Sequence, residues 1–168
     1  MKNRLVLLVL FLFTIISDQL SKYLVNQHLE LHETKIILGN LLYLRYIKNP
    51  GIAFGISFLH PKIMIVVTIL IIILFGYLFF RSSVIPNTQS ARIAVILVLG
   101  GAVGNLIDRL RMGEVIDFIE MGIAGHYWPV YNCADIFVTV GMCILIYHFA
   151  FDRATVINTT IHRTDYHE

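Results

Sequence analysis

The chain has 168 residues, of which 57% are hydrophobic and only 14% are charged, and its mean hydropathy is +0.75. A soluble domain would be about half apolar and about a quarter charged, so the composition excludes an ordinary soluble core and predicts an integral membrane protein. The formal net charge of +2 is too small to indicate a nucleic-acid partner.

The apolar residues are concentrated in four segments, which predict transmembrane helices over approximately residues 5–25, 62–81, 92–108 and 134–152. The first segment follows two basic residues, as in a signal peptide, but no small-x-small cleavage site ends it. It reaches roughly the 20 residues that a spanning helix needs, so we expect a retained first span. The polar residues 153–168 are expected to form a mobile tail.

Two charged residues lie near the end of this first span. Asp18 and Lys22 are four positions apart, so they share one face of the helix and can pair. One interpretation is a lysine that extends to the membrane surface together with its counter-ion. The other is a pair that supports a functional site, and the spacing alone does not choose between them.

The region after the first span, residues 26–60, predicts a small sheet that rests on the membrane. Residues 36–38 and 41–47 are strand-like, and Gly39-Asn40 between them is a turn dipeptide. Asn49-Pro50-Gly51 then interrupts the strand pattern. The apolar and aromatic residues 52–58 that follow are suited to the level of the lipid headgroups.

Two histidines in this region suggest zinc at first sight. His28 and His32 have the spacing of a metalloprotease helix, but that motif has glutamate directly after the first histidine, and here Leu29 is in that position. Solvated loop histidines are therefore the better interpretation.

The third span ends in a cluster of small and polar residues. Gly100 and Gly104 form a G-x-x-x-G face, which predicts close packing against another helix. That packing does not account for Asn105, Asp108 and Arg109, which come directly after it. Polar groups at such a depth are expensive in lipid and commonly have a function.

Aspartates are the remaining candidates for catalysis. No serine, cysteine or metal-ligand arrangement suited to catalysis is found near them, and the candidates are Asp108, Asp117 and Asp135. Two carboxylates in a site of low dielectric constant titrate as a pair, and one can act as a base toward water while the other donates a proton, as in aspartic proteases. The alternative is structural: Asp108 pairs with Arg109 or Arg111, and Asp135 caps its helix.

These residues also occur in motifs that resemble those of the lipoprotein signal peptidases (signal peptidase II), and the resemblance covers nearly the whole chain. The motifs are Asp18-Gln19-x-Ser21-Lys22, Asn49-x-Gly51-x-Ala53-Phe54, Gly100-Gly101-Ala102-x-Gly104-Asn105-x-x-Asp108-Arg109, Val115-x-Asp117-Phe118 and Asn132-x-Ala134-Asp135. The resemblance implies a metal-independent aspartic protease without a cofactor. Such enzymes lie in the bacterial inner membrane and remove the signal peptide of diacylglyceryl-modified prolipoproteins.

The resemblance also assigns roles to residues. Asp117 and Asp135 become the catalytic pair, and the choice of Asp117 over Asp108 comes from the resemblance alone. The residues expected to bind substrate or support the site are Asp18, Lys22, Asn49, Gly51, Gly101, Asn105, Arg109, Asn132 and Ala134. Residues 26–60 then correspond to an extracytoplasmic β-sheet cradle with a flap, residues 109–133 form an extracytoplasmic loop, and globomycin-type inhibitors are expected to bind.

The predicted architecture is thus an all-α integral membrane protein of four transmembrane helices with a small extracytoplasmic sheet and an interfacial flap. Four spans put both termini on one side. Basic residues divide almost evenly between the two sides, but Lys2 and Arg4 flank the first helix, so we expect cytoplasmic termini and a site near the outer face. A proton-coupled transporter and a structural adaptor are the rival interpretations, and replacement of Asp117 or Asp135 by asparagine distinguishes them.

Overall fold

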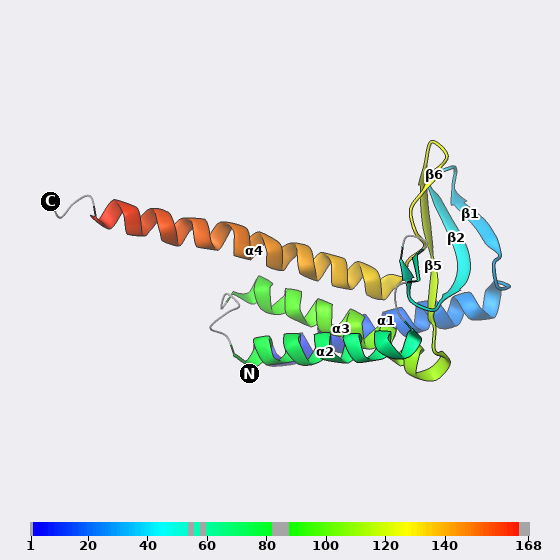
Figure 1. Cartoon of the computed structure of the whole chain (residues 1–168), viewed down its shortest axis with the longest axis horizontal. Helices are drawn as coiled ribbons and strands as arrows, with labels where there is room; N and C mark the ends of the chain where they lie inside the picture. The colour runs from blue at the N-terminus through cyan, green and yellow to red at the C-terminus, as the bar shows by residue number, and fades with distance from the viewer. Residues whose placement is uncertain (1, 54–55, 58–59, 82–87, 165–168) are drawn as a thin grey trace.

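The computed structural model describes residues 2–53, 56–57, 60–81 and 88–164 (Figure 1). It contains four helices, which are α1 (Lys2–His28), α2 (Pro61–Phe80), α3 (Gln89–Met112) and α4 (Cys133–Thr164). Within the described residues these four are long and apolar enough to cross a membrane. Their positions agree with the four predicted spans to within a few residues, apart from the far end of α4.

The end of α4 differs from the expectation. The candidate span within α4 ends at Phe151, close to the predicted residue 152. The helix itself continues to Thr164, through most of the segment predicted to be a mobile tail. No glycine or proline follows Gly141, so the sequence holds no residue that would strongly disfavour the helix. Residues 165–168 lie outside the described part of the chain, and mobility of the tail stays a prediction.

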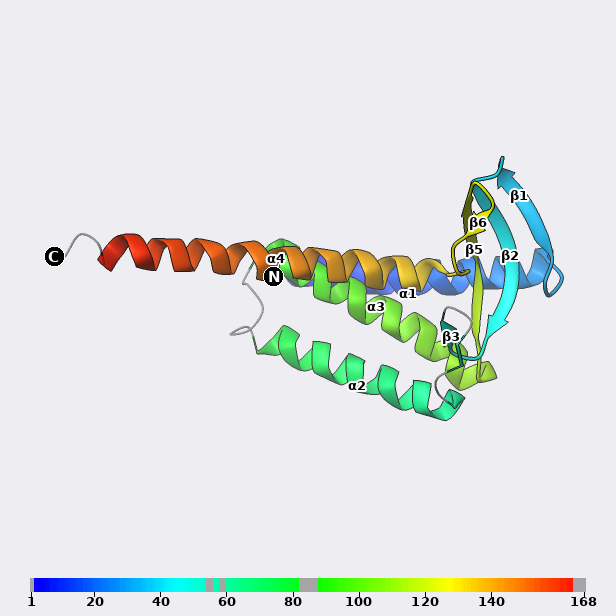
Figure 2. The same cartoon turned by 45° about the horizontal axis from the view of Figure 1, so that its top comes forward.

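Helix α3 lies at the centre of the bundle and contacts each of the other three helices (Figure 2). Its glycines allow this close packing, as the G-x-x-x-G pattern predicted. A Cβ atom at Gly104 would lie 2.6 Å from Asp18 Oδ2, and Gly100 faces the fully buried side chain of Thr14. Ala94, Val95 and other small or branched residues of α3 pack against Leu145 in an apolar core.

A small antiparallel sheet lies across one end of the bundle (Figure 1). Its four strands are β1 (Thr34–Leu38), β2 (Leu42–Asn49), β5 (Val115–Ile123) and β6 (His126–Tyr127), in the order β1-β2-β5-β6. The turn predicted at Gly39-Asn40 joins β1 to β2, and Gly39 has a φ of +47°. The predicted sheet is therefore confirmed.

Two features near the sheet qualify the expectations. A loop was predicted for residues 109–133, but α3 continues to Met112, and Val115–Ile123 forms the strand β5 beside β2. Most of β5 is buried, so its sequence lacks the polar and apolar alternation that marks a half-exposed strand. In the segment predicted to be a flap, β3 (Ile52–Ala53) and β4 (Ile56–Ser57) pair, while residues 54–55 and 58–59 lie outside the described residues.

Candidate active site

A buried ionic cluster lies where α1 and α3 meet beneath the sheet. Lys22 Nζ is 2.8 Å from Asp18 Oδ2, 2.8 Å from Asp108 Oδ2 and 2.9 Å from Asn105 Oδ1. These three acceptors match the three donors of an ammonium group. The Lys22 side chain is only 2% exposed, so the interpretation in which it extends to the membrane surface is wrong. Asp108 pairs with this lysine, and the predicted alternative of an ion pair with Arg109 or Arg111 is also wrong.

Asn105 connects this cluster to α4 through hydrogen bonds. Its Oδ1 accepts hydrogen bonds from Lys22 and from Asn132 Nδ2, the latter at 3.1 Å. Its Nδ2 donates to Asp135 Oδ1 at 2.8 Å. Because Lys22 can only donate hydrogen bonds, it fixes which end of the Asn105 amide points toward Asp135.

The N-terminus of α4 is held by a reciprocal pair of hydrogen bonds. Asn132 Oδ1 accepts from the Asp135 backbone N–H, and Asp135 Oδ2 accepts from the Asn132 backbone N–H, both at 3.1 Å. Asp18 Oδ1 accepts from the Ala134 N–H at 2.9 Å. Asp135 was expected to be the N-cap, but α4 begins at Cys133, so Asn132 is the N-cap. Asp135 is the third helical residue and completes the capping box with Oδ2, while its Oδ1 accepts from Asn105.

Asp117 extends from strand β5 toward Asn132 at the start of α4. The backbone of Tyr131 pairs with Ile119, which brings the residue before α4 alongside this strand. Asp117 Oδ1 then accepts from Asn132 Nδ2 at 2.7 Å, and Oδ2 accepts from Asn49 Nδ2 at 2.8 Å. The backbone N–H of Gly51 donates to Asn49 Oδ1 at 2.9 Å.

The electrostatic environment of Asp117 favours its neutral form. The residue is 3% exposed. Burial raises the pKa of Asp117 to about 7, and the charge of Asp135 adds to the increase, while the hydrogen bonds from Asn49 and Asn132 oppose it. A carboxyl that titrates near neutral pH is suited to proton transfer.

Arg109 adds a positive charge beside the carboxylates. Its guanidinium interacts electrostatically with Asp135, Asp117 and Asp108. Its Nη1 lies 3.4 Å from Thr68 Oγ1, which ties the end of α3 to α2. Gly101 acts through packing instead, because a Cβ atom there would collide with the Ala134 carbonyl oxygen of α4. This close approach of α3 and α4 brings Asn105 to Asp135.

Comparisons with known proteins show which family the chain belongs to. The family model described as signal peptidase (SPase) II matches residues 10–151. The chain belongs to the signal peptidase II family. Similar curated proteins, each named lipoprotein signal peptidase, come from Moorella thermoacetica (40% identity, covering 82% of this chain and 88% of that protein) and Bacillus velezensis (38% identity, covering 84% and 91%).

Two solved structures of a bacterial membrane enzyme have similar folds. One aligns with a TM-score of 0.80 at 28% identity, covering 89% of this chain and 90% of the other. The second aligns with a TM-score of 0.77 at 29% identity, covering 88% and 94%. The chain is thus a multi-pass membrane protease of the signal peptidase II family with four transmembrane helices and a small sheet.

Relative to the expectations for a signal peptidase II, the site gains two residues. Asp108 was considered as a catalytic candidate, but it belongs to the ionic cluster around Lys22. Gln19 was part of a motif without a role, and its Nε2 donates to Asp108 Oδ1 at 3.0 Å and to the Gly104 carbonyl oxygen at 3.1 Å. Gln19 and Asp108 are more than 80 positions apart in the chain, so the sequence did not indicate this contact.

His28 and His32 stand apart from this polar cluster. His28 is the last residue of α1, and His32 has a φ of +71° in the turn that follows. Across the described residues, no three His, Cys, Asp or Glu side chains come together to hold a metal ion. Only His32 is the loop residue that the sequence interpretation favoured, because His28 belongs to the helix.

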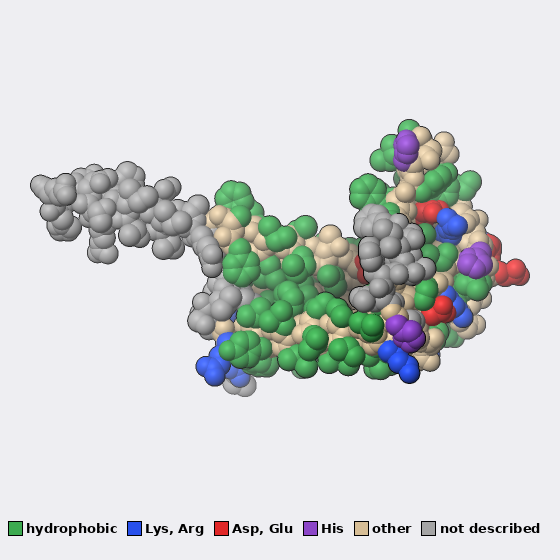
Figure 3. Space-filling model, viewed as in Figure 1, with side chains coloured by type: hydrophobic (Ala, Val, Ile, Leu, Met, Phe, Trp, Pro, Cys, Tyr) green, Lys and Arg blue, Asp and Glu red, His purple; other side chains and the backbone are tan. Residues whose placement is uncertain are grey.

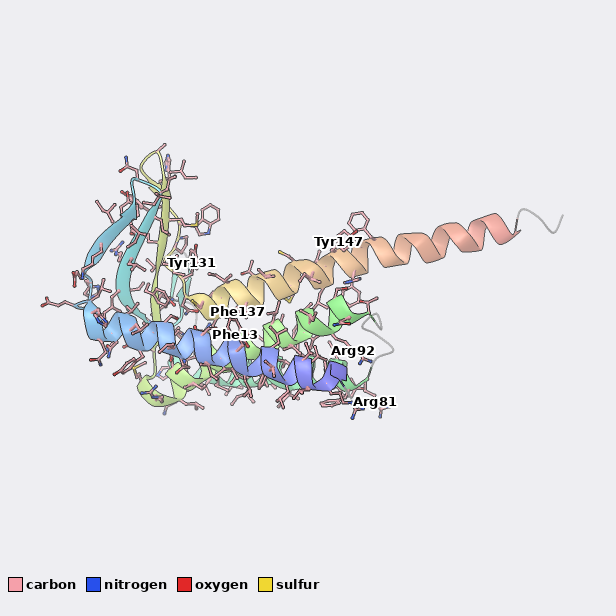
Figure 4. The ribbon with its side chains drawn as sticks, turned by 180° about the vertical axis from the view of Figure 1, so that it is seen from behind. Phe13, Arg81, Arg92, Tyr131, Phe137 and Tyr147 are labelled. Carbon is pink, nitrogen blue, oxygen red and sulfur yellow. The ribbon has the colours of Figure 1, made fainter. Side chains whose placement is uncertain are left out.

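Beside Asp135 the surface is hollowed into a groove of about 820 Å³. One wall is the hairpin of β5 and β6, and the other is the first turns of α4. Tyr131 is among the residues that line the groove, and in Figure 4 it lies between the sheet and the start of α4.

Proposed function

We propose that this protease removes the signal peptide of diacylglyceryl-modified prolipoproteins, cleaving immediately before the lipidated cysteine, and that Asp117 and Asp135 activate the attacking water. The double attachment of Asn132 carries the proposal. Its Nδ2 is 2.7 Å from Asp117 Oδ1, and its backbone N is 3.1 Å from Asp135 Oδ2. One residue therefore holds both carboxylates in a single site.

The two carboxyl groups have unlike surroundings, which suits them to opposite roles. Asp135 accepts two N–H hydrogen bonds at the positive end of the α4 dipole, where an ionised carboxylate is stabilised. Asp117 is buried in the sheet, and its pKa of about 7 lets it hold a proton at neutral pH. Asp135 is then the base and Asp117 the acid.

In the first step Asp135 takes a proton from water as the water oxygen attacks the scissile carbonyl carbon, and Asp117 gives its proton to the carbonyl oxygen. The product is a neutral diol. In the second step Asp117 takes a proton from one hydroxyl, Asp135 gives its proton to the leaving nitrogen, and the C–N bond breaks. Both carboxyl groups return to their starting states.

We place the protein in the bacterial inner membrane with its termini in the cytoplasm. Lys and Arg side chains occur at both ends of the bundle (Figure 3), and the orientation rests on Lys2 and Arg4 beside the first helix. Both chain ends lie away from the sheet (Figure 1). Arg81 and Arg92 are at that same end in Figure 4, as expected for a cytoplasmic side. The active site would then face the outer surface, where the scissile bond of a membrane-anchored signal helix emerges from hydrocarbon.

The distribution of buried polar groups argues against a proton-coupled transporter. The buried charged side chains of the described residues gather at the sheet end, and they are Asp18, Lys22, Asp108, Asp117 and Glu120. A relay across the membrane would need such groups along its whole depth. An adaptor would have no need to hold two carboxylates around one asparagine.

The test is cleavage of a diacylglyceryl-modified prolipoprotein by the purified protein in detergent, with a chelator present. We expect cleavage that globomycin inhibits, and we expect Asp117→Asn and Asp135→Asn each to abolish it. The exposed Glu30→Gln variant, which also loses one carboxylate, should stay active. Absence of cleavage by folded protein, with lipidation of the substrate verified, would contradict the proposal.

A further inference from the structure

The groove beside Asp135 is continuous with the active site along both of its walls. Side chains alternate between the faces of a strand, so the face of β5 that carries Asp117 also carries Ile119, Met121 and Ile123. Met121 and Ile123 line the groove. On the opposite wall, successive turns of α4 contribute Asp135, Ile136, Thr139 and Val140 to the lining. A substrate group bound at the carboxylates can therefore extend from them along an apolar surface in this groove.

The lining is strongly apolar away from the active site. Among the described residues that line it, Asp135 is the only Asp, Glu, Lys or Arg, and aromatic and aliphatic side chains form most of the rest. Trp128 and Tyr127 of the hairpin lie at its rim, and such rings prefer the level of the lipid headgroups. Ile136 and Val140 are exposed on α4, one turn apart. The groove thus leads from a polar end to the side of a transmembrane helix.

Its size indicates which part of a lipidated substrate fits. A helix with a diameter of about 10 Å would fill a volume of about 820 Å³ with only about two turns. A signal helix must cross roughly 30 Å of hydrocarbon and so is far too large. Flexible acyl chains can enter such a groove and continue along α4 into the bilayer.

We propose that this groove between the β5–β6 hairpin and α4 binds the acyl chains of the diacylglyceryl group on the substrate cysteine. The inference rests on the proposed function. The glyceryl esters would lie at the level of Trp128, and the chains would run past Ile136, Thr139 and Val140. The signal helix must then approach Asp117 and Asp135 from another side.

Trp128 is the only tryptophan in the chain, so the tryptophan fluorescence of the protein comes from this one position at the rim of the groove. The probe is a short peptide that begins with a diacylglyceryl cysteine, and its acyl chains carry bromine, which quenches tryptophan fluorescence on contact. It should quench Trp128 more strongly than a brominated phospholipid does at the same mole fraction. Equal quenching by the two would show that ordinary bilayer lipid fills the groove, and it would overturn the proposal.

A kinetic test uses the purified wild-type protein, Thr139→Phe and the control Leu8→Phe, which lies at an exposed position of α1 outside the groove. Overfilling the groove should lower kcat/KM for a substrate with long acyl chains by roughly tenfold or more, with less effect on a substrate carrying short chains. The control should leave both values near those of the wild type.

The possible outcomes separate this inference from the proposed function. If wild-type protein cleaves and Thr139→Phe affects long and short chains equally, only the groove assignment is wrong. Cross-linking of a photoreactive signal helix to Ile136 or Val140 would overturn it as well. If wild-type protein fails to cleave any lipidated substrate, the proposed function fails and this inference fails with it.

Discussion

Lys22 and Asp135 are linked through a single amide. The ammonium of Lys22 donates to Asn105 Oδ1 at 2.9 Å, and the Nδ2 of the same side chain donates to Asp135 Oδ1 at 2.8 Å. The buried ions of α1 and α3 therefore set the orientation of a group that contacts the proposed base. This link predicts that residues without any contact to substrate control the geometry of the reaction.

Replacement of Lys22 by methionine should be strongly destabilising. It would leave Asp18 and Asp108 buried without their counter-ion, a defect that costs roughly 3–5 kcal/mol in free energy of unfolding. Thermal denaturation in detergent measures this. The control is Lys35→Met, which removes an exposed pair with Glu33 and should lower the melting temperature far less. Equal effects of the two changes would contradict the buried cluster.

Asn105→Ala should impair catalysis more than substrate binding. It removes the donor to Asp135 Oδ1 and the acceptor for Asn132, so both proposed catalytic carboxylates lose their positioning. Loss of one positioned donor commonly lowers kcat by about 10²-fold or more, and we expect an effect of that order with a small change in KM. A steady-state comparison with the lipidated substrate tests this, and a change confined to KM would argue against the positioning role.

The activity should fall as pH rises through the pKa of Asp117, which is about 7. Above that value Asp117 loses the proton that it donates to the carbonyl oxygen. The measurement is kcat/KM against pH in detergent, with folding verified at each pH. A rate that continues to rise well into the alkaline range would rule out Asp117 as the acid.

The free energy of unfolding should also depend on pH through the titration of Asp117. The pKa of Asp117 is raised in the folded state from an ordinary value of 3.8, so the folded form binds more protons between these two values. The contribution of Asp117 to stability is therefore fully present below about pH 4 and is lost as pH rises through about 7. Asp117→Asn should abolish this contribution, and an unchanged pH profile of unfolding would show that the group does not titrate there.

Gly104→Ala and Gly76→Ala form a matched pair of helix substitutions. A methyl group at Gly104 would meet Asp18 Oδ2 at 2.6 Å, whereas one at Gly76 meets no atom within 4 Å. Overpacking should destabilise the first by roughly 1–3 kcal/mol. The second should be neutral or stabilising by up to about 1 kcal/mol, because alanine favours helix. Similar melting temperatures for the two variants would mean that α1 and α3 can move apart enough to accommodate the added methyl group.

The protein class and most of the framework can be predicted from the sequence. Long apolar segments specify spanning helices because a backbone in lipid must satisfy its own hydrogen bonds. Gly39-Asn40 specifies the turn before β2, and the i,i+4 spacing of Asp18 and Lys22 specifies their pairing. Gly100 and Gly104 specify a close helix contact. Each of these depends on residues near one another in the chain, where local geometry decides the outcome.

Contacts between groups that are distant in the chain could not be predicted in this way, and they are seen in the folded protein alone. The spacing of residues favoured an arginine partner for Asp108, but close packing of α1 against α3 gives it Lys22. Strand β5 was not foreseen, because burial on both faces removes the alternation that marks a strand. Its pairing with Tyr131 brings Asp117 to Asn132. The contacts that assemble the two aspartates join separate elements, and such contacts are set by the packing of buried surfaces and the pairing of buried polar groups.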